Sequence, residues 1–327
     1  MKTLSVSQVS MYNTCPYKWY LRYGQRLELA TIKPGSALLG DAVHRGVAAY
    51  LKERAVKKSA SLQIIQDAVN EFAASVSSRI RLEDKADADS LFSEAVLIAQ
   101  RLVKEVLRDY EVVVHDGTPM IEFTCRAPLS EDIEFVGVVD AVLRSRHDGC
   151  IYLVDWKVRS RFLTMEEMLN EQIALYAYAL KQMGISVTAS VIYQVKAQSP
   201  AKPSLNLDGS MSRRKIFTTW DMYKEALIDA GLNPDDYTDM QEKLSDTELS
   251  RIILVPHAED TLAVFWDNLT KQVFRMIENA GREPYRNYGY PCRSCEFAPI
   301  CTAQLYKHDL DEVMNAYLVR EDSDVNA

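Results

Sequence analysis

Apolar residues recur at helical spacing through most of the first third of the chain. The pattern extends over residues 41–58 and again over 62–110, and a period of about 3.6 residues indicates amphipathic helices. Ahead of it, Pro16 stands where a proline commonly opens a helix, so a short helix is predicted over 17–23. The N-terminal third is therefore predicted to be mainly helical.

The period changes after Asp116-Gly117, where short runs rich in β-branched residues begin. These runs are separated by turn formers such as Asp148-Gly149 and cover residues 120–126, 135–143 and 151–158. Such an arrangement is typical of consecutive antiparallel strands.

Helical spacing returns over residues 165–183, and Gly184 marks the expected end of that helix. Another strand is predicted over 186–196, and a last amphipathic helix over 264–279 leads into a cysteine-rich segment. This order of elements predicts an α/β (α+β) fold in which a sheet is flanked by helices.

The composition is that of an ordinary globular protein, with 47% hydrophobic and 26% charged residues. A formal net charge of −8 argues against nucleic acid as a partner, but residues 221–248 alone carry nine acids and two lysines, or −7 of that charge. A positive groove elsewhere is therefore compatible with the sequence. The first residues lack a signal-peptide pattern and no eighteen apolar residues run together, so we expect a cytoplasmic protein of a bacterium or virus, with no membrane partner.

Residues 198–256 follow no clear period and are predicted to be an insertion. Its first part is basic and carries Pro, Ser and Gly, whereas its second part is the acidic stretch. The basic part would suit an arm over a substrate, and the acidic part would suit DNA mimicry or the docking of a partner. The sequence leaves these roles open.

The first candidate site combines Asp140 with Asp155 and Lys157 on the predicted hairpin. Strand side chains alternate, so Asp155 and Lys157 leave the same face, and the neighbouring strand can bring Asp140 beside them. Both acids end apolar runs, where a charge needs a partner or a metal, although surface charges on a hairpin are common. Carboxylates suit Mg²⁺ or Mn²⁺, and a lysine can orient the attacking water, so the chemistry suggested is phosphodiester hydrolysis.

Two weaker features accompany this site. Gln172 and Tyr176 stand at i and i+4 on the following helix and therefore share one face. This spacing suits two residues that contact one ligand, and equally a core tyrosine with a polar neighbour. His44 shares a helix face with apolar residues, which suits either a metal ligand or a buried histidine. Glu122, on the strand before the hairpin, is a further candidate acid.

The third feature is Cys292-Arg-Ser-Cys295-Glu-Phe-Ala-Pro-Ile-Cys301, with Cys15 as a candidate fourth ligand. Four thiolates can hold tetrahedral Zn²⁺ or a four-iron cluster, and spacing alone does not separate the two; ordinary apolar burial is the remaining alternative. Cys125 and Cys150 fall on predicted strands and are expected in the core.

At this point the chain resembles the PD-(D/E)XK nuclease superfamily, in particular its RecB-like and AddB-type nuclease domains and the CRISPR-associated iron-sulfur exonucleases. The resembling segments stand in the family's order along the chain: Leu4-Ser5 through Cys15-Pro16 and Trp19-Tyr20, Gly40 to His44, Gly137 to Asp140, Asp155 to Lys157, Gln172 to Tyr176, and the terminal cysteine run. Residues 198–256 match no motif of the family.

The resemblance implies roles for individual residues. His44, Asp140, Asp155 and the carbonyl of Trp156 resemble the ligands of Mg²⁺ or Mn²⁺, and Lys157 resembles the catalytic lysine. Gln172 and Tyr176 resemble the helix motif that supports the site and contacts DNA. Cys15, Cys292, Cys295 and Cys301 resemble the ligands of a [4Fe-4S] cluster, with structural Zn²⁺ as the alternative.

The resemblance also implies an organisation and a function. We expect a central mixed sheet in a nuclease core over 31–197 and 257–279, an N/C-terminal iron-sulfur clasp over 1–30 and 280–327, and the insertion between. The expected activity is a metal-dependent DNA exonuclease of recombination, DNA repair or end processing, or else a catalytically inactive DNA-binding or partner-holding subunit. No G-x-x-x-x-G-K-[ST] phosphate loop occurs, so a helicase or recombination partner would be a separate protein.

Overall fold

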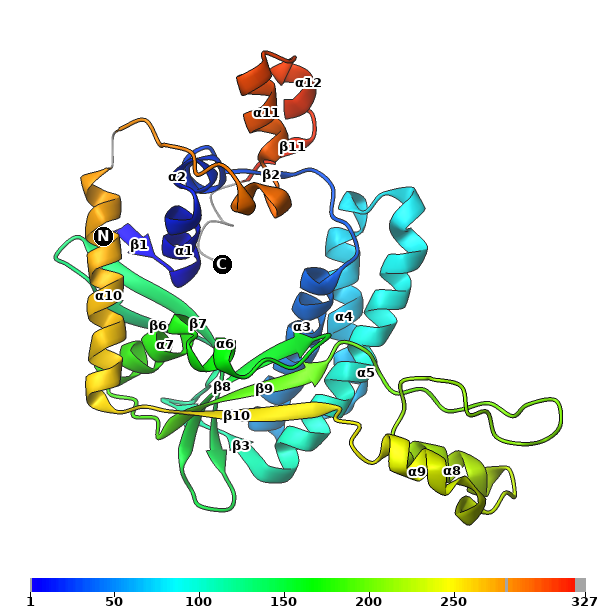
Figure 1. The fold of residues 1–327 in the computed structure, drawn as a ribbon. Helices are drawn as coiled ribbons and strands as arrows, with labels where there is room; N and C mark the ends of the chain where they lie inside the picture. Colours follow the sequence, from blue (N-terminus) through cyan, green and yellow to red (C-terminus); the bar gives the residue numbers. More distant parts are fainter. Residues whose placement is uncertain (1, 280–281, 321–327) are drawn as a thin grey trace.

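The computed structural model describes residues 2–279 and 282–320, and its centre is a mixed sheet (Figure 1). Along the sheet the strand order is β1-β7-β8-β9-β10, and β3 and β6 pair with the other edge of β7. The strands are β1 (Lys2–Leu4), β3 (Tyr110–Val112), β6 (Ile121–Pro128), β7 (Ile133–Ser145), β8 (Ile151–Arg159), β9 (Ala189–Lys196) and β10 (Ser250–Pro256). The three strands predicted in the middle of the chain are thus β6, β7 and β8, which pair antiparallel as expected.

The mixed character of the sheet comes from the connection between β8 and β9. These strands are parallel, and the chain crosses between them through α6 (Met165–Met168) and α7 (Glu171–Gln182). The helix predicted over 165–183 is therefore two helices, because Asn170 caps the start of α7 by accepting a hydrogen bond from the Gln172 amide.

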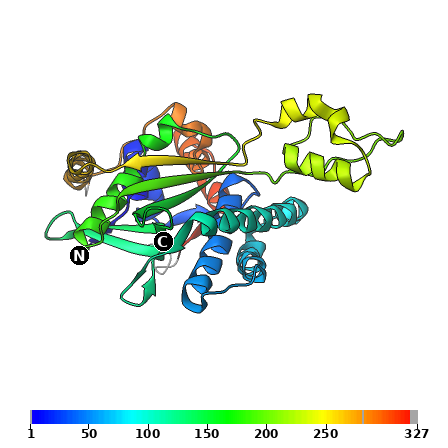
Figure 2. The ribbon, with the colours of Figure 1, turned by 90° about the horizontal axis from the view of Figure 1, so that it is seen from below.

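Helices cover both faces of the sheet (Figure 2). On one face α3 (Ser36–Lys57), α4 (Gln63–Val76) and α5 (Lys85–Asp109) pack over β8 and β9. A methyl group added to Gly46 of α3 would lie 2.9 Å from Ile65 of α4, so the absence of a side chain there allows these helices to approach closely. On the other face α7, α1 (Val6–Thr14) and α10 (Glu259–Glu278) enclose the second core.

The periodic stretch over 62–110 contains α4 and α5 rather than one helix. Two short 3₁₀ turns and an isolated bridge between Ile32 and Ile80 separate them. Within α5 the buried positions follow a stripe of helical period: Ile98, Ala99, Leu102, Val103 and Val106. This stripe is the amphipathic pattern seen in the sequence, and it faces the sheet core.

The insertion leaves β9 and returns as β10, and it projects from one end of the sheet (Figure 1). It holds α8 (Trp220–Asp229) and α9 (Thr238–Leu244), which share a small core of their own around Tyr223 and Tyr237. Its boundary differs from the expected one, because residues 250–256 pair with β9 along their whole length as β10. The insertion therefore occupies residues 198–249.

The two ends of the chain meet in a separate layer. Strand β2 (Leu27–Leu29) pairs antiparallel with β11 (Tyr317–Val319), and α2 (Pro16–Trp19) packs near α11 (Ala298–Tyr306) and α12 (Leu310–Met314). A further two-stranded hairpin joins β4 (Val114–His115) and β5 (Thr118–Pro119). Of the expected clasp, residues 1, 280–281 and 321–327 lie outside the described residues. None of the described helices combines the length and apolar character of a membrane span.

Candidate active site

Strand β7 changes the face that it presents at Asp140. Val139 packs in the core beneath α7, whereas Ala141 packs in the core beneath α3 and α5, although regular alternation would put them on one face. The partner strand is irregular at the same point, because Glu122 lies opposite and has a φ of 49°. This irregularity lets the side chains of Asp140 and Glu122 project from the sheet toward α3.

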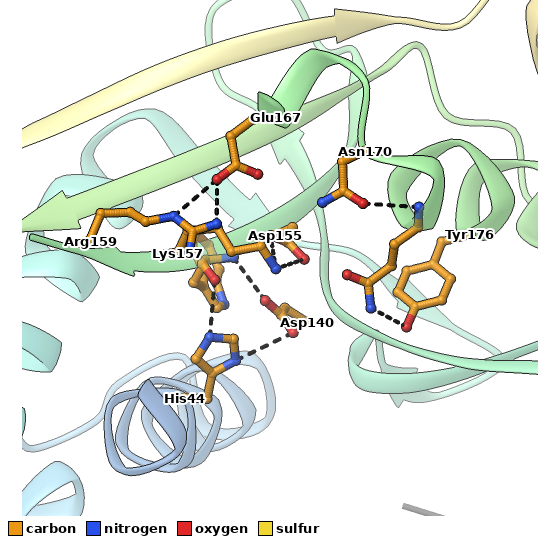
Figure 3. Close-up of polar contacts among 10 residues, drawn as sticks. His44, Asp140, Asp155, Lys157, Arg159, Glu167, Asn170 and Tyr176 are labelled. Carbon is orange, nitrogen blue, oxygen red and sulfur yellow. Dashed lines mark hydrogen bonds and ion pairs between the residues drawn. The ribbon is translucent and has the colours of Figure 1, made fainter. Parts of the chain in front are cut away.

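On α3, His44 faces Asp140 (Figure 3), and Glu122 lies close to both. Its Nδ1 lies 3.4 Å from Oδ1 of Asp140, and its Nε2 lies 3.0 Å from the carbonyl oxygen of Trp156. One potential ligand atom from each of His44, Glu122 and Asp140 lies within 4.8 Å of the other two. The other oxygen of Asp140 accepts a 2.8 Å hydrogen bond from the Trp156 amide, which fixes the carboxylate.

His44 is held between two groups that can only accept hydrogen bonds. Burial lowers the pKa of His44, but its hydrogen bond to Asp140 and the charges of Asp140, Asp155 and Glu122 outweigh that effect and raise the pKa to about 9. The imidazolium therefore places a positive charge where the carboxylates and the Trp156 carbonyl converge. A divalent cation would satisfy the same oxygens.

Asp155 is the most buried acid of the site, with 5% of its surface exposed. Burial first, and then the charge of Asp140, raise its pKa to about 6, although Lys157 acts in the opposite direction. Lys157 Nζ lies 2.9 Å from Oδ1 and 2.7 Å from Oδ2 of Asp155. Burial lowers the pKa of Lys157, but the Asp155 carboxylate outweighs it, so the amine stays charged.

The donor set fits a hard divalent cation. Carboxylates of Asp140 and Glu122, a backbone carbonyl and one imidazole are ligands that Mg²⁺ and Mn²⁺ accept. Burial, followed by the charge of Asp140, also raises the pKa of Glu122, which is the mark of acids crowded without enough positive charge. Within the described part of the chain, buried Oδ2 of Asp155 accepts no well-directed hydrogen bond. Asp155 is turned to Lys157 and is not one of the close trio.

The helix residue Tyr176 lies beside the hairpin (Figure 3). Gln172 Nε2 donates a 2.8 Å hydrogen bond to the Tyr176 hydroxyl, so the i, i+4 pair is joined as its spacing suggests. The Tyr176 ring packs on Gly137 of β7, where a Cβ would lie 2.2 Å from Cε1 of the ring. Burial raises the pKa of Tyr176 above its ordinary value, so its hydroxyl stays protonated.

A cavity of about 1140 Å³ opens beside His44 and Lys157. Its lining comes from α3, α4, β6 and β8 and includes His44, Glu122, Lys157 and Arg159. Arg159 follows Lys157 by two residues, and its guanidinium pairs with the buried carboxylate of Glu167 on α6. This pair was not predicted from the sequence, where Glu122 was named only as a further candidate acid. The clue for Arg159 was the strand face that it shares with Asp155 and Lys157.

The four cysteines of the expected clasp line one other cavity, of about 250 Å³. Cys15 comes from the end of α1, Cys292 and Cys295 from the turn before α11, and Cys301 from α11 itself. The remaining two are elsewhere. Cys125 is fully buried in the sheet, where burial raises its pKa to about 12; Cys150 lies in the turn before β8 and is half-buried, not in the core as expected.

Comparison with known proteins agrees with this geometry. The model of the PD-(D/E)XK nuclease superfamily matches residues 3–302, which spans both sheet cores and the cysteine run. No curated protein matches the chain. Members of this superfamily are generally nucleases that use divalent metals such as Mg²⁺ or Mn²⁺. Because the match covers most of the chain and the acids converge on one candidate metal site, the protein belongs to the PD-(D/E)XK nuclease superfamily.

Proposed function

We propose that this protein is a divalent-metal-dependent DNA exonuclease. The observation that carries the proposal is the meeting of Asp140, His44 and the Trp156 carbonyl in front of the buried Asp155–Lys157 pair. This arrangement combines oxygen ligands for a hard cation with one lysine that stays charged. Action from DNA ends is inferred from the resemblance to the iron-sulfur exonucleases.

The chain's own residues divide the work of phosphodiester hydrolysis. His44, Glu122, Asp140, Asp155 and the Trp156 carbonyl would hold the metal, which when bound supplies Lewis acidity and an activated water. Lys157 orients the water and stabilises the charge that develops on the phosphoryl oxygens. The Gln172–Tyr176 pair, fixed over Gly137, supports the hairpin from the side of α7, and we propose that it also contacts DNA.

We further propose that Cys15, Cys292, Cys295 and Cys301 bind a [4Fe-4S] cluster. All four line one cavity, and Phe297 and Leu21 of its lining would shield a cluster from water. The choice of an iron cluster over a single Zn²⁺ rests on the resemblance to the iron-sulfur exonucleases, since four thiolates can hold either centre.

The surroundings of the cysteines also suit an anionic cluster. Burial raises the pKa of the Cys301 thiol, while a hydrogen bond from Arg286 and its charge act in the opposite direction. Burial also raises the pKa of the Cys295 thiol, and the positive charge of Lys18 acts in the opposite direction. The proposed cluster would be structural, because it ties residue 15 to the 292–301 segment and closes most of the chain into one loop.

Recombination, repair or DNA end processing is the setting that we propose, with DNA as the substrate and a separate helicase or recombination protein as a partner. The activity is tested by incubating anaerobically purified protein with end-labelled linear DNA and Mg²⁺ or Mn²⁺. We expect nucleotide release that EDTA abolishes and that Lys157→Met lowers by at least about 100-fold. Release that persists in EDTA or in Lys157→Met would contradict the assignment.

A further inference from the structure

We propose that Arg159 binds a backbone phosphate beside the scissile one, and that Lys196 and Arg251 continue this phosphate path away from the metal site. The inference rests on the proposed nuclease function and adds a substrate-binding subsite to it. It starts from a buried acid, Glu167, that metal binding does not use.

Glu167 is 3% exposed and lies on α6, next to the end of β8. Its Oε1 accepts a 3.0 Å hydrogen bond from Nε of Arg159 and a second bond from Nη2 (Figure 3). A carboxylate taken out of water needs such a partner. The pair fixes the guanidinium, whose side chain remains about one-third exposed and lines the active-site cavity.

Strand alternation places Arg159 on the same face of β8 as Asp155 and Lys157. Asp155, Lys157 and Arg159 are two residues apart along β8, so their side chains leave the same face. Nε and Nη2 of Arg159 are used by Glu167, and among the described residues no hydrogen bond is found for Nη1. An arginine held in this way presents the rest of its planar fork to an anion, which a phosphate oxygen fits.

Two further cations continue this face across the neighbouring strands. Lys196 of β9 is the direct partner of Arg159, and Arg251 of β10 is the partner of Gln194, which is two residues from Lys196. All three basic side chains therefore leave one face of the sheet. They line up across β8, β9 and β10, starting at the active-site cavity.

An aromatic side chain orders the two outer cations. Phe162, in the loop after β8, has Lys196 Nζ 4.5 Å and the Arg251 guanidinium 5.1 Å from its ring centre. Cation–π contacts hold such groups in place while leaving their charge available. Lys196 also donates to the Ser160 carbonyl, and Arg251 pairs with Glu248 on the exposed side. A row of ordered cations that begins at a nuclease site suits the phosphates of one DNA strand.

The test measures DNA binding in a background that cannot cleave. Asp155→Ala protein is titrated with a fluorescent single-stranded oligonucleotide and with a duplex of the same sequence, at several salt concentrations. Adding Arg159→Met should weaken binding by at least about tenfold and reduce the log–log salt slope by about 0.7 to 0.9, the loss of one phosphate contact. Arg159→Lys, which keeps the charge but loses the fork, should recover part of the affinity.

Controls separate this role from a structural one. Arg146→Met removes one positive charge at the opposite end of the hairpin, where Arg146 faces Glu111, and should leave affinity and slope unchanged. Arg159→Met combined with Glu167→Leu avoids an unpaired buried acid, so it keeps the fold testable. A folded double variant with the parental affinity and salt slope would overturn the proposal. DNA binding is measured here without cleavage. If the wild type proved inactive as a nuclease while Arg159→Met still weakened DNA binding, only the nuclease function would be rejected, and the phosphate subsite would stand.

Discussion

The ring of Tyr176 lies so close to the backbone of Gly137 that no side chain fits between them. A Cβ built on Gly137 would stand 2.2 Å from Cε1 and 2.7 Å from Cδ1 of the ring. Gly137 lies three residues before Asp140 on β7, and the Tyr176 hydroxyl holds Gln172. The packing of one helix residue on one glycine therefore connects α7 to the strand that carries the metal site.

Replacing this glycine should disturb both stability and chemistry. We expect Gly137→Ala to cost about 1 to 3 kcal/mol of unfolding free energy, because the buried ring must move, and to lower cleavage by displacing Tyr176 and Gln172. Gly40→Ala is the matched control: its Cβ would meet nothing within 4 Å on α3, so it should stabilise by about 0.5 to 1 kcal/mol. Chemical denaturation of the two variants checks this, and equal stability of both would contradict the close packing.

Metal binding should release protons. His44 has a pKa raised to about 9 and Asp155 a pKa raised to about 6, so at pH 7.5 the metal-free site carries a proton on His44 that a cation must expel. Apparent affinity for Mn²⁺ should therefore rise about tenfold per pH unit between pH 7 and 8.5. Calorimetry in buffers of different ionisation enthalpy should count about one proton released, and none in His44→Gln. A proton count near zero in the wild type would contradict the charged imidazole.

The same shift fixes the sign of the stability change without metal. The pKa of His44 in the folded state lies above the ordinary 6.5 of histidine, so protonated His44 stabilises the fold, and this contribution is fully present below pH 6.5. This contribution should be lost as the pH rises through about 9. Urea denaturation of wild type and His44→Gln in EDTA should show stabilities that differ most near pH 6 and converge above pH 9. Curves that diverge at high pH would be inconsistent with the Asp140 contact.

Loss of a cysteine should act on the fold before the chemistry. Under the proposed cluster, wild type purified without oxygen should carry about four iron atoms per chain, and Cys295→Ser should lose iron, solubility and thermal stability together. Cys150→Ser, in the turn far from the cysteine cavity, is the control and should keep its iron. One zinc and no iron in the wild type would favour the alternative centre, and full stability of Cys295→Ser would exclude a structural role.

The insertion should be removable. Strands β9 and β10 are antiparallel neighbours, and the amide of Lys196 still donates to the carbonyl of Leu249 at 2.9 Å. A two-residue Asn-Gly turn can join strands in this register. Replacing residues 197–248 by Asn-Gly, so that the turn directly joins Lys196 to its partner Leu249, should therefore give a folded, metal-binding protein. Failure of that variant to fold would show that the small core of the insertion supports the sheet.

Local patterns in the sequence were enough to find the hairpin and α7. Alternation along β8 places Asp155 and Lys157 on one face, and the i, i+4 spacing joins Gln172 to Tyr176; both depend only on neighbours in the chain. Strand β10 was assigned to the insertion because residues 198–256 as a whole follow no clear period. Its true partner, β9, is more than fifty residues away along the chain.

Contacts between layers were beyond these patterns. The meeting of His44 with Asp140 joins a helix to a strand nearly a hundred residues later, and the turn of Glu122 toward them depends on a backbone irregularity at φ 49°. The Arg159–Glu167 pair is similar, because it joins β8 to a separate element, the short helix α6. Periodicity predicts which face a residue occupies, but not which charge on another element it meets.

The most direct test of the proposed function compares linear and closed circular DNA as substrates. Wild type and Asp155→Ala are incubated anaerobically with each DNA and Mn²⁺, after both proteins are shown to fold and to carry equal iron. We expect wild type to degrade the linear DNA completely, to leave the circles intact, and to lose this activity in Asp155→Ala. Cleavage of the circular DNA would show that the same site acts as an endonuclease and not as an exonuclease. Equal inertness of wild type and variant, with DNA binding retained, would contradict the nuclease function itself.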